Sequence, residues 1–85
     1  MMTMKLKDHK YAQCHVEQDN SKTVFVSYST PVIFIIKENG RRWVECTGTY
    51  SQTTRKQIGF FLKEYAPDLN YHDIKGIVGK GLVEI

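Results

Sequence analysis

The residues best suited to chemistry lie in the stretch GTYSQTTRKQIGFFL, residues 48–62. Hydroxyl side chains crowd its first half, and two cations, Arg55 and Lys56, follow directly. A helix that begins here would present unpaired backbone N–H groups and the positive end of its dipole, which together favour a phosphate or a carboxylate. We therefore predict an anion- or partner-binding site at this corner. Its candidate residues are Ser51, Thr53, Thr54, Arg55, Lys56, Arg41 and Arg42.

Helix capping explains part of the same cluster. Ser51 or Thr53 at the N-cap would accept a hydrogen bond from the first turn, and Thr54 with Gln57 fits a capping box. Cations in a first helical turn oppose the helix dipole, so the two cations suggest an external anion as their partner. The sequence leaves both interpretations open.

The net charge of +3 is concentrated around this stretch, because residues 41–56 carry four cations against Glu45 alone. A local positive excess attracts nucleic acid or an acidic protein surface. Tyr11 and Trp43, beside Arg41 and Arg42, would offer a stacking surface for single-stranded nucleic acid if they lie on the outer side of their strands. Cross-strand packing explains such aromatic residues equally well.

No motif in the chain requires catalysis or a cofactor. The histidines and cysteines show no CxxC or HxxxH pair, so we expect no bound metal, no cofactor and no enzyme activity. Cys14 and Cys46 are expected to be reduced and buried, and a disulfide would require their strands to be neighbours. The histidine and cysteine residues are His9, Cys14, His15, Cys46 and His72.

The elements that must position these residues are strands first and helices after. Alternation predicts a strand over residues 10–17 after a flexible leader over residues 1–9. Residues 22–37 favour one long strand, bent at Thr30-Pro31, and two separate strands are the alternative. Asn39-Gly40 predicts a tight type I′ hairpin with a return strand that ends near residue 47.

Helical periodicity follows. Ile58, Phe61, Leu62 and Tyr65 form one apolar stripe of a helix over about residues 53–65. Asn70 caps a second, shorter helix. Residues 10–85 thus predict a single α+β domain: an antiparallel meander of three to four strands with a long bent second strand, then an amphipathic helix packed on the sheet and a second short helix.

Two phrases, SYSTPV at residues 27–32 and YSQTTRKQIGFFL at residues 50–62, fit one pattern. The pattern is a Ser-Tyr-x-Thr-x-Val strand, a short hairpin, and Tyr-Ser-x-Thr-Thr leading into a helix that ends Phe-Leu. In this the chain resembles an uncharacterised family of small phage and prophage proteins. The resemblance implies a shared fold and an origin in a mobile element, and it supplies no activity. The matching residues are Ser27, Tyr28, Thr30, Val32, Tyr50, Ser51, Thr53, Thr54, Phe61 and Leu62.

These observations predict a small, non-enzymatic, phage-type binding protein that blocks a host macromolecule, either a protein or a nucleoprotein complex. The alternative is a nucleic-acid-binding accessory protein that uses the basic patch around residues 41–56. We expect a cytoplasmic location and no membrane partner, because the polar start lacks the apolar region of a signal peptide and the longest apolar run, VIFII, is too short for a membrane span. The sequence does not indicate an oligomeric state.

Overall fold

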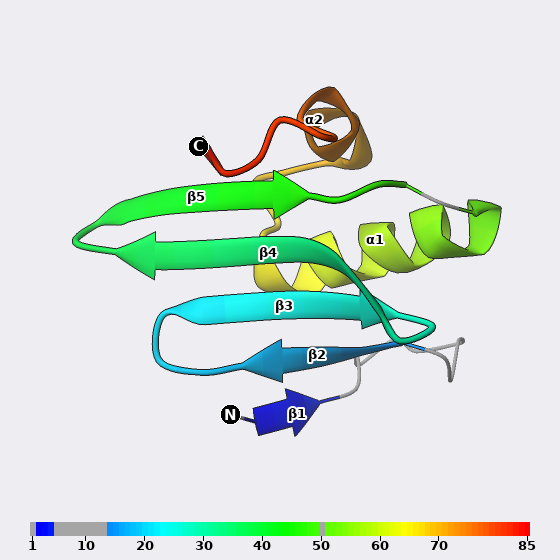
Figure 1. Cartoon of the computed structure of the whole chain (residues 1–85), viewed down its shortest axis with the longest axis horizontal. Coiled ribbons are helices and arrows are strands. Elements are labelled where there is room, and N and C mark those ends of the chain that lie inside the picture. The colour runs from blue at the N-terminus through cyan, green and yellow to red at the C-terminus, as the bar shows by residue number, and fades with distance from the viewer. Residues whose placement is uncertain (1, 5–13, 50) are drawn as a thin grey trace.

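The structure is a computed structural model, and it describes residues 2–4, 14–49 and 51–85 (Figure 1). These residues build one antiparallel sheet in which each strand pairs with the next strand along the chain. The predicted α+β class, with one helix and then a short helix after the main strands, is confirmed. The elements are β1 (Met2–Met4), β2 (Cys14–Gln18), β3 (Lys22–Ser27), β4 (Thr30–Glu38), β5 (Arg41–Cys46), α1 (Gln52–Tyr65), α2 (Tyr71–Gly76) and β6 (Val83–Glu84).

The long bent strand predicted over residues 22–37 is wrong, and the alternative of two strands is right. β3 and β4 are antiparallel neighbours joined by a tight turn at Tyr28 and Ser29. Both turn residues have a positive φ, 51° and 70°, as a two-residue type I′ turn requires. The position of this turn was not predicted, because the residues that adopt it are neither glycine nor asparagine. The Thr30-Pro31 pair, where the bend was expected, lies just after the turn.

A β-bulge directly follows this turn. Phe25 pairs with Ile33 but Val26 pairs with Pro31, so Val32 is the extra residue on β4. Val32 and Ile33 are therefore both buried in the same core cluster. From there the side chains alternate, so that Phe34 and Ile36 point away from that core.

The second hairpin agrees with its prediction. Asn39 and Gly40 have φ values of 52° and 75°, and Glu38 pairs with Arg41 across them. The register is thereby fixed for the whole of β4 and β5, which places Ile36 opposite Trp43.

A short strand lies at each edge of the sheet. Met2–Met4, expected in a flexible leader, form β1 and pair with β2. Residues 5–13, which hold the rest of that leader and the start of the predicted 10–17 strand, lie outside the described residues. At the opposite edge, β6 pairs with β5.

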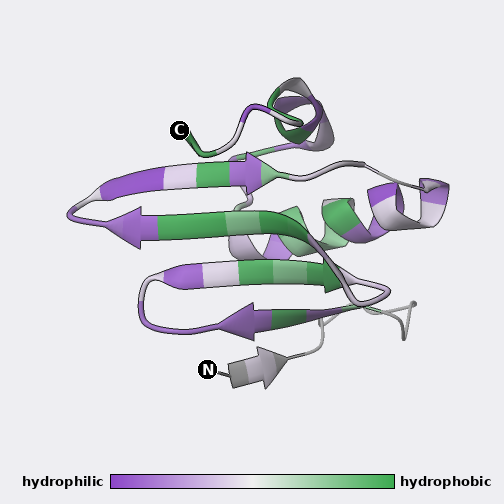
Figure 2. Ribbon diagram, viewed as in Figure 1, coloured by the Kyte–Doolittle hydropathy of each residue, from purple (hydrophilic) through white to green (hydrophobic). Residues whose placement is uncertain are grey.

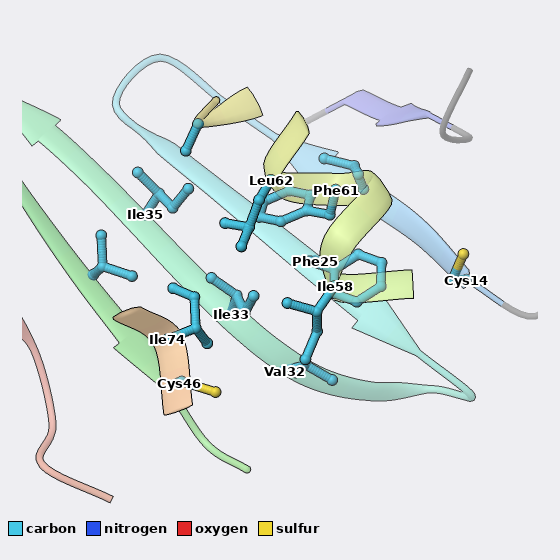
Figure 3. Packing of buried hydrophobic residues seen from close by; sticks show 13 residues of the cluster. Cys14, Phe25, Val32, Ile33, Ile35, Cys46, Ile58, Phe61, Leu62 and Ile74 are labelled. Carbon is cyan, nitrogen blue, oxygen red and sulfur yellow. The ribbon is translucent and has the colours of Figure 1, made fainter. Parts of the chain in front are cut away.

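One face of the sheet is covered by both helices, and the core lies between them and the sheet (Figures 1 and 3). Phe61 of α1 is fully buried, and its ring stacks on Phe25 and Tyr65 at centroid distances of 5.0 and 5.1 Å. The predicted apolar stripe of α1 is thus the surface that packs on the sheet. Ile74 brings α2 into the same cluster.

Candidate functional site

The hydroxyl cluster at the start of α1 is mainly structural. Ser51 is the N-cap, and its Oγ accepts a hydrogen bond from the backbone N–H of Thr54 at 3.2 Å. The Thr54 hydroxyl is buried and lies 3.2 Å from both Ser51 Oγ and Ser27 Oγ. Capping at Ser51 is therefore confirmed, and the hydroxyl of Thr54 joins the helix to the end of β3.

Gln57 has a different role from the predicted capping box with Thr54. Its side chain is fully buried, and its Oε1 accepts a hydrogen bond from Ser27 Oγ at 2.5 Å. Its Nε2 has no hydrogen-bond partner in the described structure. A buried amide that keeps a free donor costs about 1–3 kcal/mol. Among the buried polar side chains between α1 and the sheet in the described structure, which include Ser27 and Thr54, Gln57 is the one with an unsatisfied atom.

The two cations of the helix start remain exposed. Arg55 and Lys56 lie in the first turns of α1, whose first turn contains no acidic residue. Within the described residues neither cation has a carboxylate within 4 Å. Thr53 is half-buried beside them.

Arg41 and Arg42 lie at the opposite end of β5, next to the Asn39-Gly40 turn (Figure 1). Arg41 forms two hydrogen bonds to Glu84, at 2.8 and 2.7 Å. Arg42 reaches the other way, with bonds of 3.0 and 2.6 Å to Asp68 between the helices. Both arginines are therefore bound to carboxylates of the same chain.

The predicted site is thus divided into two parts by the length of β5. Its hydroxyls and two exposed cations lie at the start of α1, while its two arginines lie at the far hairpin and are already paired. The hydrogen bonds from Arg42 and Arg41 hold the pKa values of Asp68 and Glu84 below their ordinary range, and the same bonds raise the pKa of each arginine. The basic patch around residues 41–56 does not form one continuous surface.

A different cluster emerges on the side of the sheet that the helices leave uncovered. We call this the helix-free face, and in Figure 1 it is turned toward the viewer while α1 lies behind the sheet. Strand register assigns its side chains, because directly paired residues share a face. They are Thr3, His15, Glu17, Lys22, Val24, Val26, Pro31, Phe34, Ile36, Glu38, Arg41, Trp43, Glu45 and Glu84.

The centre of the helix-free face is apolar. Val24 and Val26 are only 5% exposed, yet neither belongs to the core cluster under the helices. Phe34, Ile36 and Trp43 are half-buried and are likewise absent from that core. Figure 2 shows that the middle of β3 and β4 is hydrophobic, with residues of both faces coloured alike, and that β4 is hydrophilic towards its end near the Asn39-Gly40 turn. We call Val24, Val26, Phe34, Ile36 and Trp43 the apolar strip.

Charged groups surround the apolar strip. Lys22 Nζ lies 5.5 Å from the centroid of the Phe34 ring, and Arg41 Cζ lies 5.0 Å from that of Trp43. His15 Nε2 is 2.9 Å from a Glu17 carboxylate oxygen. Glu45 pairs directly across from Phe34 in the sheet. The arrangement offers an apolar surface with a charged rim, as protein-binding surfaces do.

Sequence reasoning named only Trp43 among the residues of the strip. The signal for the others was present, because the Asn39-Gly40 turn fixes which residues of β4 and β5 oppose each other. Counting back from that turn puts Phe34, Ile36, Trp43 and Glu45 on one face. Tyr11, named together with Trp43, lies outside the described residues.

Among the described residues, the thiols and imidazoles do not gather into one cluster. Cys14 and Cys46 are both buried and form no disulfide, since they lie on β2 and β5, which are not neighbours in the sheet. Burial raises the pKa of both thiols. His15 is half-buried and His72 is exposed. Across residues 2–4, 14–49 and 51–85, no three histidine, cysteine or acidic side chains gather as metal ligands would. No helix in this part of the chain is both long and apolar enough to span a membrane.

The fold and the helix-free face together define a small α+β domain whose sheet has one face covered by helices and one face that the described helices leave uncovered. The chain belongs to the family of unknown function DUF8033, whose sequence pattern matches residues 2–75. The expectation of an uncharacterised family is thereby confirmed. No curated protein and no solved structure gives a significant match.

Proposed function

We propose that this protein is a non-enzymatic binding protein, and that it uses the apolar strip of its helix-free face to bind and block a host protein. The observation that carries the proposal is the placement of Phe34, Ile36 and Trp43, half-buried outside the core and surrounded by charge. Aromatic residues in an apolar centre with a polar rim are typical of protein interfaces. Small size and the resemblance to phage and prophage proteins support a blocking role for this contact.

The charges of the helix-free face favour a protein over a nucleic acid. Glu45 lies directly opposite Phe34, and Glu84 directly opposite Trp43. A nucleic-acid strand stacked on these rings would bring its phosphates close to both carboxylates, which repel them. Nucleic-acid binding through the region of residues 41–56 is the alternative. It would depend on Arg55 and Lys56, because Arg41 and Arg42 are already paired with carboxylates.

Capture from a host-cell lysate, with and without nuclease, tests the proposal when it is combined with variants. The tagged wild-type chain is expected to retain one partner protein after nuclease treatment, and that partner is then identified, purified and titrated directly. Phe34→Ala with Trp43→Ala is expected to weaken binding at least about tenfold, as the loss of aromatic anchors does at other interfaces. Circular dichroism and thermal unfolding confirm that this variant is folded.

The matched control is Arg55→Glu with Lys56→Glu, which alters the exposed start of α1 and leaves the helix-free face intact. We expect this control to bind the purified partner as wild type does. The proposal is wrong if the control loses binding while the Phe34/Trp43 variant retains it, or if nuclease removes every captured species.

A further inference from the structure

Among the described residues, Glu45 is the one carboxylate that faces the middle of the apolar strip without a cation of its own. It is half-buried on β5, two residues beyond Trp43 on the same face, and it pairs across the sheet with Phe34. Within that part of the chain its carboxylate has neither a hydrogen bond nor an ion pair. A partly desolvated carboxylate beside an aromatic ring is a site for a cation.

The neighbouring pair of residues shows which cation fits this geometry. Trp43 has Glu84 as its direct cross-strand partner, just as Phe34 has Glu45. The guanidinium of Arg41 contacts both of these residues: its Cζ lies over the Trp43 ring, 5.0 Å from the centroid, and it donates two hydrogen bonds to the Glu84 carboxylate. A planar guanidinium satisfies the ring and the carboxylate together, whereas an ammonium group is a point charge without that fork.

Phe34 and Glu45 form the same pair without the guanidinium. Lys22 lies over the Phe34 ring at 5.5 Å, but in the described structure it forms no ion pair with Glu45. The carboxylate therefore stays available on the rim of the strip. The described residues of the helix-free face carry a net negative charge, although the whole chain carries +3. The acidic residues are Glu17, Glu38, Glu45 and Glu84, and the cations are Lys22 and Arg41.

From this repeated geometry we propose that the partner presents an arginine side chain to the helix-free face, with its guanidinium over Phe34 and paired with the Glu45 carboxylate. The inference rests on the proposed function and specifies the chemistry of its partner: an arginine-bearing protein segment with apolar neighbours that cover the strip. The net positive charge of the chain disfavours non-specific attraction of such a segment, so selective binding has to come from this face.

Trp43 makes the test direct, because it is the only tryptophan in the chain and lies beside the proposed site. The full chain is titrated with a hexa-arginine peptide and, in parallel, with hexalysine and a single-stranded oligonucleotide, while tryptophan fluorescence is recorded. We expect a saturable change with hexa-arginine and binding at least about fivefold weaker with hexalysine. Equal binding of the two peptides, or a response to the oligonucleotide alone, would overturn the proposal.

Two variants with the same chemical change locate the site. Glu45→Gln is expected to weaken hexa-arginine binding about tenfold, the loss of one charge-assisted pair. Glu38→Gln, on the same face but at the turn beyond Trp43, is expected to change it by less than about twofold. Since the Glu45 side chain has no partner in the described structure, its replacement should leave the unfolding midpoint in place.

The same variants separate this inference from the proposed function. If Glu45→Gln binds hexa-arginine as wild type does, the arginine pairing is wrong. The proposed function still stands in that case, provided that Phe34→Ala with Trp43→Ala weakens binding of the purified host partner at least about tenfold. If that double variant also retains the partner, both fail.

Discussion

The two faces of the sheet are both apolar at the centre, but one is covered by the helices and the other is bordered by charged side chains. On the covered face, Phe25, Ile33 and Ile35 meet Phe61 and other residues of the helices and are at most 2% exposed. On the helix-free face, Phe34 and Ile36 remain half-buried and are bordered by charged side chains. The run VIFII therefore supplies residues to both faces.

The difference shows that hydrophobic content alone does not distinguish a core from a binding surface. A core residue is surrounded by other side chains of the same chain, so its truncation leaves a cavity. Among the described residues, half-buried side chains of the apolar strip such as Phe34 and Trp43 contact only sheet neighbours, so their removal should affect stability less and binding of a partner more. If the two faces differ in this way, matched substitutions on them should have unequal effects on stability.

The largest expected effect is on the covered face. Phe61→Ala removes a ring that stacks on Phe25 and Tyr65, and it should lower the free energy of unfolding by about 3–5 kcal/mol. Phe34→Ala, the same substitution on the helix-free face, should cost clearly less because that ring is already partly exposed to solvent. Urea unfolding of both variants measures the difference. Equal losses would mean that the helix-free face is a second core.

The next effect concerns the turn that assigns residues to faces. A shift of one residue in the β3–β4 register would exchange the two faces, and this register is set at Tyr28 and Ser29, both at positive φ. The double variant Tyr28→Asn with Ser29→Gly carries the residue pair of the other hairpin. It should stabilise the chain by about 1–2 kcal/mol in urea unfolding, because it removes left-handed strain.

The reverse exchange at the other hairpin is the control for this prediction. Asn39→Tyr with Gly40→Ser should destabilise the chain, since it places residues with bulkier side chains at two positive φ values. A loss of stability in the variant of the first turn would show that Tyr28 makes contacts worth more than the strain.

These two turns also show how much of the fold can be predicted from the sequence. Asn39-Gly40 is a recognised type I′ signal, so β4, β5 and their register follow from the sequence. Tyr28 and Ser29 adopt the same conformation without being the residues that favour it, because the pairing of β3 with β4 overrides the local preference. No local pattern would have indicated that turn. The α1 boundaries and both N-caps, in contrast, are local features and were predictable.

The candidate site was less accessible from sequence for a related reason. Arg41 and Arg42 are close to Arg55 and Lys56 in sequence, yet β5 separates them in space. The carboxylate partners of the first two lie far along the chain, at residues 84 and 68, and meet them only through the fold. Charge counting over a window of sequence cannot anticipate such pairs.

Buried polar side chains on the covered face give a further test of how that face is stabilised. Gln57 is buried there with an unpaired Nε2 in the described structure, while Ser27 Oγ keeps the Thr54 hydroxyl as a second neighbour. Gln57→Met should therefore raise the free energy of unfolding by roughly 1 kcal/mol, because it replaces an unsatisfied amide by an apolar side chain of similar length. Ser27→Ala should lower it by about 1–3 kcal/mol, since the whole Gln57 amide is then unsatisfied. A Gln57→Met variant less stable than wild type would show that the amide has a partner of its own in solution.

The smallest effect compares one ion pair on each face. Arg42 reaches Asp68 from the helix side of β5, and Arg41 reaches Glu84 on the helix-free face. Folding lowers the pKa of both carboxylates, so each pair stabilises the fold above the carboxylate's unfolded pKa, and this contribution is lost as the pH falls through the folded value, below about pH 4. Asp68→Asn and Glu84→Gln should each reduce the acid dependence of the urea midpoint and leave its slope near pH 7 unchanged. Asp68→Asn should reduce this acid dependence more than Glu84→Gln does, because the side chain of Arg42 is 18% exposed and that of Arg41 is 59% exposed. A larger effect from Glu84→Gln would mean that the ion pair on the helix-free face stabilises the fold more than the pair on the helix side.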